Sequence, residues 1–243
     1  MFNHLKATIG FFTIIPVGRN LEFNPKAMTP FFPVVGLLIG AIVAVCDQVF
    51  IRIWPSPVAS ILDIAILALI TGALHLDGVA DTADGLYGQR PVDRALEIMK
   101  DSRVGAMGVV AVVLCLAAKW AGFTAMDAHR PLAILIIPAL SRTSAIFGTQ
   151  FLPYGRPEGG LGKDFFTFRI KPLNYIWALV PVALSMFMGI RGSILILMHL
   201  TITFGVLFYY KKKVNCMTGD MLGALIEINE AGMLLVMAAK WGA

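Results

Sequence analysis

The sequence contains few charged residues. Asp, Glu, Lys and Arg make up 14% of its 243 residues, hydrophobic residues make up 58%, and the mean hydropathy is +0.78. Because soluble domains carry about 25% charged residues, this composition excludes a soluble protein and predicts one surrounded by lipid. Each crossing of a bilayer needs about 20 apolar residues. Six or seven crossings would therefore use most of the chain and leave no room for a separate soluble domain.

Cysteines, repeats and linkers are also scarce or absent. Cys46, Cys115 and Cys216 are odd in number and the first two lie in apolar runs, so we expect neither a disulfide framework nor a zinc site. No long repeat, low-complexity tract or Ser/Gly linker interrupts the chain. The net charge is +5, but the basic residues are scattered over the loops without the aromatic-interleaved patch of a nucleic-acid-binding protein. We therefore expect one integral-membrane domain over residues 1–243 and no nucleic-acid partner.

Long apolar runs predict an all-α, polytopic transmembrane bundle. We expect about seven spans, or six if the last is not a span, because Glu227 and Glu230 lie inside it. The apolar run at 7–17 is too short to be a span, and without an A-x-A site it predicts no cleaved signal peptide. The predicted spans are residues 32–54, 57–76, 104–126, 131–150, 173–189, 192–210 and 221–241.

Basic residues alternate between the connecting segments. They cluster before the first predicted span and after the second, fourth and sixth, whereas single arginines follow the first, third and fifth. The positive-inside rule predicts that the clustered segments and the N-terminus lie in the cytoplasm. We expect the protein to be in the inner membrane. The clusters are Lys6, Arg19 and Lys26; Arg90, Arg94, Lys100 and Arg103; Arg156, Lys163, Arg169 and Lys171; and Lys211, Lys212 and Lys213.

Three aspartates follow the second predicted span. Asp77, Asp81 and Asp84 are four and three residues apart, so on a helix their carboxylates share one face. Aligned carboxylates at a membrane boundary are best neutralised by a hard cation such as Mg²⁺, which commonly serves a phosphate substrate. The alternative is an acidic, solvated loop. We predict that the three aspartates are catalytic metal ligands.

Small and titratable residues flank these aspartates. Gly78 and Gly85 lack side chains and would let a large ligand approach the backbone. His75 is either a general base, a partner of another site residue, or a satisfied histidine at the membrane interface.

The segment 91–103 predicts a short amphipathic helix on the cytoplasmic surface, with proline in its first turn. Lys100 and Arg103 could bind phosphate, or could be ordinary positive-inside residues. Asp101 could complete the metal shell. The later loop at 153–163 is glycine-rich and basic, but lacks the spacing of a P-loop; with Arg156 it is either a phosphate-binding loop or a flexible lid.

Several charges fall inside predicted spans. Asp220 and Glu227 are seven residues apart on one helical face, so they form either a second acidic ligand set or interhelical pairs. An unpaired Arg142 would be costly in mid-span, so it should pair with one of the nearby acids or with a substrate anion. We expect Lys119 to extend its amine to the outer interface.

The chain resembles a known family of membrane enzymes, the adenosylcobinamide-GDP ribazoletransferases, also called cobalamin synthases. The resemblance covers nearly the whole chain, and its two central blocks are highly specific. The matching motifs are Phe-Thr-Ile-Ile-Pro at 12–16, Phe-Pro-Val-Val-Gly at 32–36, His-Leu-Asp-Gly-Val-Ala-Asp-Thr-Ala-Asp-Gly at 75–85, Ile-Met-Lys-Asp-Ser-Arg-Val-Gly at 98–105, and Thr-Gly-Asp at 218–220 with Gly223.

This resemblance implies the last assembly step of cobalamin. In that reaction α-ribazole, or its 5′-phosphate, is joined to adenosylcobinamide-GDP and GMP is released, with Mg²⁺ as cofactor. It also implies that Thr218 contacts substrate. The expected partners are these small molecules and membrane lipid, together with either a second copy of the chain or other enzymes of cobalamin assembly.

Two other functions are compatible with intramembrane acids. A CDP-alcohol phosphotransferase also uses Asp-Gly with spaced aspartates, but Asp81 and Thr82 stand where that family has Ala and Arg. An ion-coupled transporter would place its charges near the middle of the bilayer, whereas the clustered aspartates here lie at the end of a span.

Overall fold

The computed structural model describes residues 1–18, 21–156, 158–160 and 162–240, and nearly all of its regular structure is helical. Arg19 and Trp241, which entered the topology and span predictions, lie outside the described residues. Four 3₁₀ segments, η1 (Thr29–Phe31), η2 (Lys163–Phe166), η3 (Pro172–Ala178) and η4 (Met186–Met188), connect or extend helices. The α-helices are α1 (Phe2–Phe12), α2 (Pro25–Met28), α3 (Phe32–Ile53), α4 (Ser56–Thr71), α5 (Leu74–Leu86), α6 (Val92–Ile98), α7 (Ala106–Ala125), α8 (Arg130–Phe151), α9 (Leu179–Ser185), α10 (Ile190–Lys213) and α11 (Gly219–Ala238).

The prediction of an all-α membrane bundle is confirmed, although the number of spans is lower than seven. Within the described residues, five helical stretches are long and apolar enough to cross a membrane: α3 with the short helices before it, α7, α8, α10 and α11. A sixth span is possible if α4 and α5 act together. The predicted span at 173–189 is only a short apolar helical segment, Asn174–Met188, with 3₁₀ turns at both ends, and it is shorter than the about 20 residues that a span needs.

The predicted continuous span at 57–76 is also corrected. α4 ends at Thr71, and α5 leaves it at an angle of 90°. Gly72 and Ala73 both adopt positive φ, 60° and 55°, a conformation that ends helices. The aspartates that follow therefore lie on a separate short helix rather than in a loop.

Two glycines bring α3 against α8, the most deeply buried of the candidate spans. Gly36 and Gly40 form a G-x-x-x-G pattern, which allows close approach of membrane helices. A Cβ at Gly36 would lie 2.4 Å from the Ala139 Cα, and one at Gly40 would lie 2.2 Å from the Leu135 carbonyl oxygen. Any side chain at either glycine would force these helices apart.

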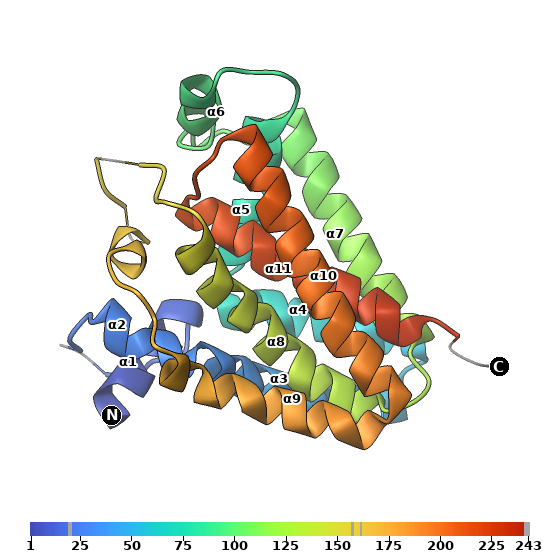
Figure 1. Cartoon of the computed structure of the whole chain (residues 1–243). Coiled ribbons are helices and arrows are strands. Elements are labelled where there is room, and N and C mark those ends of the chain that lie inside the picture. The colour runs from blue at the N-terminus through green and yellow to red at the C-terminus, as the bar shows by residue number, and fades with distance from the viewer. Residues whose placement is uncertain (19–20, 157, 161, 241–243) are drawn as a thin grey trace.

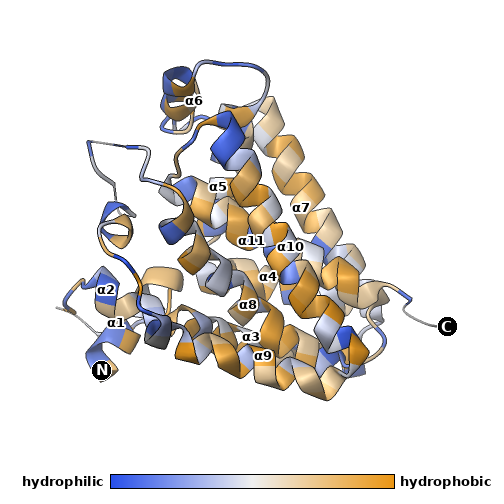
Figure 2. Cartoon of the chain, in the orientation of Figure 1, coloured by the Kyte–Doolittle hydropathy of each residue, from blue (hydrophilic) through white to orange (hydrophobic). Residues whose placement is uncertain are grey.

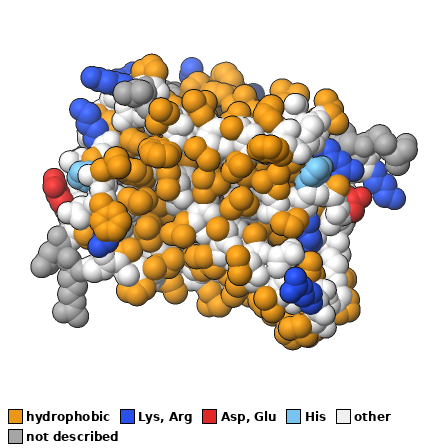
Figure 3. Space-filling model, turned by 90° about the horizontal axis from the view of Figure 1, so that it is seen from below, with side chains coloured by type: hydrophobic (Ala, Val, Ile, Leu, Met, Phe, Trp, Pro, Cys, Tyr) orange, Lys and Arg blue, Asp and Glu red, His pale blue; other side chains and the backbone are white. Residues whose placement is uncertain are grey.

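The outer surface of the bundle has the pattern expected for contact with lipid. The long helices are mostly apolar, and polar residues concentrate at α6 and near α1 and α2 (Figure 2). The face that carries α3 and α9 is covered by hydrophobic side chains, with charged side chains toward its two ends (Figure 3).

The connecting segments gather at two opposite ends. At one end, the Ser56 hydroxyl donates to the Thr124 carbonyl at 3.0 Å, and Arg191 pairs with Asp127 at 3.1 Å. At the other end lie α1, α5, α6 and the segment after α8 (Figure 1). These are the segments that the basic clusters predicted to share one compartment.

Candidate active site

α5 places the three predicted aspartates on one side, but their surroundings differ. Asp77 is exposed, whereas Asp81 and Asp84 are partly buried. The two oxygens of Asp84 accept hydrogen bonds from the backbone N–H groups of Gly105 and Gly108 at 2.7 and 2.9 Å. Asp84 therefore caps the N-terminus of α7, where a carboxylate is favoured by the unpaired N–H groups and by the helix dipole.

The glycines of this cap belong to the candidate site, and the sequence analysis did not single them out. A Cβ at Gly105 or Gly108 would lie 2.5 or 2.4 Å from an oxygen of Asp84. The resemblance motif ends at Gly105, and this contact gives a physical reason for glycine there.

Asp220, from the first turn of α11, joins the aspartates of α5. The charges that act on Asp81 include those of Asp220, Asp77 and Asp84, with Arg156 as an opposing cation. Arg156 pairs with Asp220 and also donates to the Met99 carbonyl at 3.0 Å. Acids from α5 and α11 and a guanidinium from the loop after α8 thus form one polar cluster.

Glu227 is paired across helices, which favours the second of the two interpretations of its spacing from Asp220. It lies deeper in the bundle, 4% exposed, and pairs with Lys119 of α7 at 2.6 Å. Lys119 also pairs with Glu230 at 2.7 Å and is only 3% exposed. The expectation that Lys119 reaches the interface is therefore wrong, because two carboxylates hold it inside.

Arg142 belongs to the same buried cluster. It is 1% exposed and pairs with Glu230, which also accepts from the Ser141 hydroxyl at 3.2 Å. Of its two expected partners, an acid or a substrate anion, the structure contains the acid. Buried charges need such partners because desolvation is costly.

A second buried ion cluster escaped the sequence analysis. Arg130 pairs with Asp47 at 2.6 Å and with Asp63 at 3.1 Å, and both aspartates are fully buried. These residues come from α8, α3 and α4. Single charges in long apolar runs were the available signal, but only the packing shows that they meet.

The predicted phosphate-binding residues after α6 are exposed. α6 ends at Ile98, so the predicted helix to residue 103 is too long. Lys100 pairs with Glu158 in the loop after α8. Arg103 pairs with Asp101 at 2.6 Å, and its hydrogen bonds lower the pKa of Asp101 to about 2. Asp101 is therefore an anion at any physiological pH.

A cavity of about 210 Å³ opens beside the acidic cluster. Its lining includes the polar side chains of His75, Asp77, Arg156 and Asp220. It also includes four phenylalanines, here called the aromatic wall, of which the first and last lie outside the motifs quoted from the sequence. They are Phe11, Phe12, Phe32 and Phe165.

The aromatic rings pack on one another and on His75. Phe12 lies 4.7 Å from Phe32 and 5.6 Å from His75 between ring centroids, and Phe165 lies 5.5 Å from Phe32. The buried Nδ1 of His75 and Nε of Arg156 have no hydrogen-bond partner. The cavity thus has flat apolar surfaces, and the Nδ1 of His75 lies 3.9 Å from an oxygen of Glu227 in the buried ion cluster.

The remaining predicted site residues have packing roles in this structure. A Cβ at Gly78 would meet the Asp220 carbonyl oxygen at 2.6 Å, and one at Gly85 would meet the Met99 side chain at 2.5 Å. The close approach that they permit here is between protein segments, and the expectation that they admit a ligand stays a prediction. Thr218 is buried and caps α11 by accepting from the N–H of Met221 at 3.2 Å.

The donor set suits a hard divalent cation. Among the described residues, no three His, Cys, Asp or Glu side chains are arranged to hold a metal ion alone. Mg²⁺, however, is usually bound by one or two carboxylates together with substrate phosphates. Asp77, Asp81 and Asp220 provide oxygen ligands and excess negative charge in one place, so the residues fit such an ion.

The helices, and the cavity with acidic and aromatic side chains at one end of them, define a multi-pass membrane protein with a site for small molecules. A model of the family described as cobalamin-5-phosphate synthase matches residues 4–238. The chain belongs to the cobalamin-5-phosphate synthase family.

Curated relatives match over nearly their full length. Adenosylcobinamide-GDP ribazoletransferases of Syntrophobacter fumaroxidans, Geotalea daltonii and Acetivibrio thermocellus are 36%, 34% and 33% identical to the chain. The alignments cover 99%, 96% and 94% of this chain and 100%, 95% and 94% of those relatives. No solved structure matches the chain.

Proposed function

We propose that the chain joins α-ribazole, or its 5′-phosphate, to adenosylcobinamide-GDP and releases GMP. Family membership and the names of the relatives support this reaction. The observation that carries it is the cavity lined by both phenylalanine rings and charged side chains. A nucleoside with a flat base and a polar ribose presents surfaces that match both.

The acceptor fits the cavity better than the donor does. Pockets for small molecules are mostly apolar with a few placed polar groups. The base of α-ribazole would lie against Phe12, Phe32 and Phe165, with its ribose toward Asp77 and Asp220. A corrinoid is far too large for about 210 Å³, so only the diphosphate of the donor would enter.

The reaction forms one phosphoester bond and breaks one phosphoanhydride bond. A ribose hydroxyl that is free in both acceptors, and therefore not the 5′ one, attacks the phosphorus nearer the corrinoid, and GMP leaves with the electrons of the broken bond. The proton of that hydroxyl passes to His75 or to a carboxylate of the cluster, and a 5′-phosphate, where present, stays on the acceptor. Arg156 binds phosphate oxygens at the cavity, and Lys100 and Arg103 offset the charge of the departing GMP from outside.

Mg²⁺ bound by Asp77, Asp81 and Asp220 would neutralise the diphosphate oxygens. The protein residues around that position hold the reactants in line and exclude water. Asp84 contributes by fixing α5 against α7.

The assay uses membranes containing the full-length chain, adenosylcobinamide-GDP, α-ribazole and Mg²⁺, with chromatography of nucleotides and corrinoids. We expect equal amounts of GMP and complete corrinoid. If neither forms while CDP-diacylglycerol and an alcohol release CMP, the chain is a phospholipid enzyme instead.

The aromatic wall gives a sharper test. Phe165→Ala should raise the KM for α-ribazole about tenfold, by losing roughly 1–2 kcal/mol of ring contact, and leave the KM for the corrinoid donor near that of the wild type. Phe50→Ala, which removes a ring packed on Trp54 at the opposite end of the bundle, is the matched control. An equal rise in both KM values would contradict the placement of the acceptor.

We also propose that the site faces the cytoplasm from the inner membrane, on the basis of the basic clusters. Gly88→Cys, at an exposed position next to α5, should resist a membrane-impermeant thiol reagent in intact cells and react in opened cells. Asp127→Cys, from the opposite end, should react in both. The reverse pattern would overturn the orientation.

A further inference from the structure

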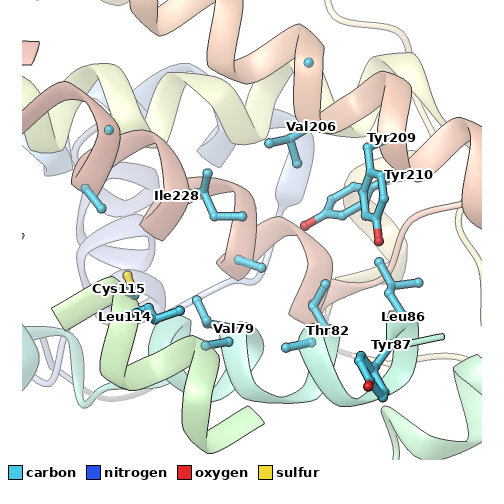
Figure 4. A pocket seen from close by; sticks show the side chains of 16 residues that line it. Val79, Thr82, Leu86, Tyr87, Leu114, Cys115, Val206, Tyr209, Tyr210 and Ile228 are labelled. Carbon is cyan, nitrogen blue, oxygen red and sulfur yellow. The ribbon is translucent and has the colours of Figure 1, made fainter. Parts of the chain in front are cut away.

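A second, larger cavity lies on the other side of α5. It is a groove of about 680 Å³ with walls from α5, α7, α10 and α11, shown in Figure 4. Its lining is almost entirely apolar and includes small residues such as Ala111, Gly205 and Ala224. Leu114, at its edge, is 64% exposed on a helix that spans the membrane, so the groove is open to the lipid phase.

Two buried hydroxyl groups at one end of this groove lack hydrogen-bond partners. They belong to Thr82, which is 6% exposed, and to Tyr210, which is 2% exposed. Both residues line the groove, close to Leu86 and Tyr87 (Figure 4). A buried hydroxyl without a partner is costly, so a ligand whose acceptor oxygens reach these two groups would be stabilised there.

A basic pocket of about 400 Å³ lies next to the groove. The two cavities share Leu86, and the basic pocket is lined by Arg90, Lys212 and Lys213. Arg90 donates to the Asp84 carbonyl at 2.8 Å and Lys213 to the Gly88 carbonyl at 2.9 Å. Among the described residues, no acidic side chain lines this pocket.

We propose that the groove binds one anionic phospholipid. The groove supplies apolar surface and hydroxyl donors, and the pocket next to it supplies cations, in the order of an acyl chain, its ester group and the phosphate. The ester carbonyl oxygens accept from Thr82 and Tyr210, and the phosphate lies among Arg90, Lys212 and Lys213. Basic pockets between membrane helices bind anionic head groups in this way. Free phosphate would leave the apolar part of the groove unfilled, so the lipid is the occupant.

The test measures lipid retained by the full-length protein in detergent, by native mass spectrometry. Phosphatidylglycerol and phosphatidylethanolamine with the same acyl chains are added separately. We expect one phosphatidylglycerol per chain, retained at about tenfold or more lower lipid concentration than phosphatidylethanolamine.

Two sets of variants separate the head-group and acyl-chain contacts. The combined Arg90→Gln, Lys212→Gln and Lys213→Gln variant should lose the preference for phosphatidylglycerol. Lys211→Gln should keep it, because Lys211 lies in the same helical turn but over the Phe151 ring, at 5.7 Å.

Gly205→Leu should weaken retention of both lipids by filling the groove, since a Cβ there meets no atom within 4 Å. Leu197→Phe, on the lipid-exposed part of the same helix, is the control and should leave the retention of both lipids unchanged. Three outcomes would overturn the proposal: equal retention of both lipids by the wild type, wild-type retention by Gly205→Leu, or chains that pair with one another and retain no lipid.

Discussion

The backbone of Asp220 occupies the space that a side chain on Gly78 would need, since a Cβ there would lie 2.6 Å from the Asp220 carbonyl oxygen. This contact sets the distance between α5 and α11, and with it the distance between Asp77 or Asp81 and Asp220.

The Gly78→Ala variant should therefore lose most activity and unfold at lower temperature, since helices that contact at a glycine must separate to admit a methyl group. Gly205→Ala is the control, because its new Cβ meets no atom within 4 Å. Activity and thermal unfolding in detergent measure the effect. A Gly78→Ala variant as active as the control would show that this spacing does not matter.

Asp84 should differ from its neighbours by stabilising the fold. Asp84→Asn weakens two hydrogen bonds at the start of α7 and should cost about 1–2 kcal/mol of unfolding free energy. Asp93→Asn, in the exposed first turn of α6, should cost much less. Thermal unfolding of both variants makes the comparison, and equal stabilities would contradict the capping role.

Asp81 should affect the metal requirement instead. Asp81→Asn removes a carboxylate from the group that includes Asp77 and Asp220, so the Mg²⁺ concentration for half-maximal activity should rise about tenfold or more. The protein should remain folded in the membrane. Near-normal turnover at ordinary Mg²⁺ would remove Asp81 from the ligand set, and retained activity after chelation by EDTA would remove the metal from the proposal.

The buried ion pairs should be sensitive to charge balance. Glu230→Gln leaves Arg142 buried without its carboxylate and should cost about 3–5 kcal/mol. The double variant Glu230→Gln with Arg142→Met should recover part of this loss, because it removes both charges of that pair. Glu97→Gln, from the exposed pair with Arg94, should cost under about 1 kcal/mol. A double variant less stable than the single one would argue against this pairing.

The fold class, and which polar segments lie at the same end of the bundle, could be predicted from the sequence. Apolar runs of about 20 residues can only be buried in lipid or in a core, and the basic clusters separate the two ends of the bundle. The four- and three-residue spacing placed Asp77, Asp81 and Asp84 on one face because the helix period is local. The bend at Gly72 and Ala73 was not predicted, because the hydropathy of a segment does not depend on the direction in which the chain runs.

Long-range contacts set the limit of prediction at the site. Glu227 lies on the same side of α11 as Asp220, but two turns of helix separate the two residues. The ion pair with Lys119 holds Glu227 inside the bundle, and helical periodicity does not predict that partner. Likewise, Phe165 resembles any other apolar residue in the sequence until the loop after α8 folds onto α1 and α3. Periodicity places residues on one helix, but it does not say which helix lies opposite.

The buried pairs of Lys119 and Arg142 also bear on how the chain is made. Both cations lie on helices that emerge from the ribosome before α11, which carries Glu227 and Glu230. During synthesis the two earlier helices therefore carry charges whose partners do not yet exist, and such helices insert poorly on their own. These two helices are therefore stably inserted only after α11 has been made. A chain that ends before residue 227 keeps these charges unpaired in the membrane, and we expect membrane proteases to degrade it.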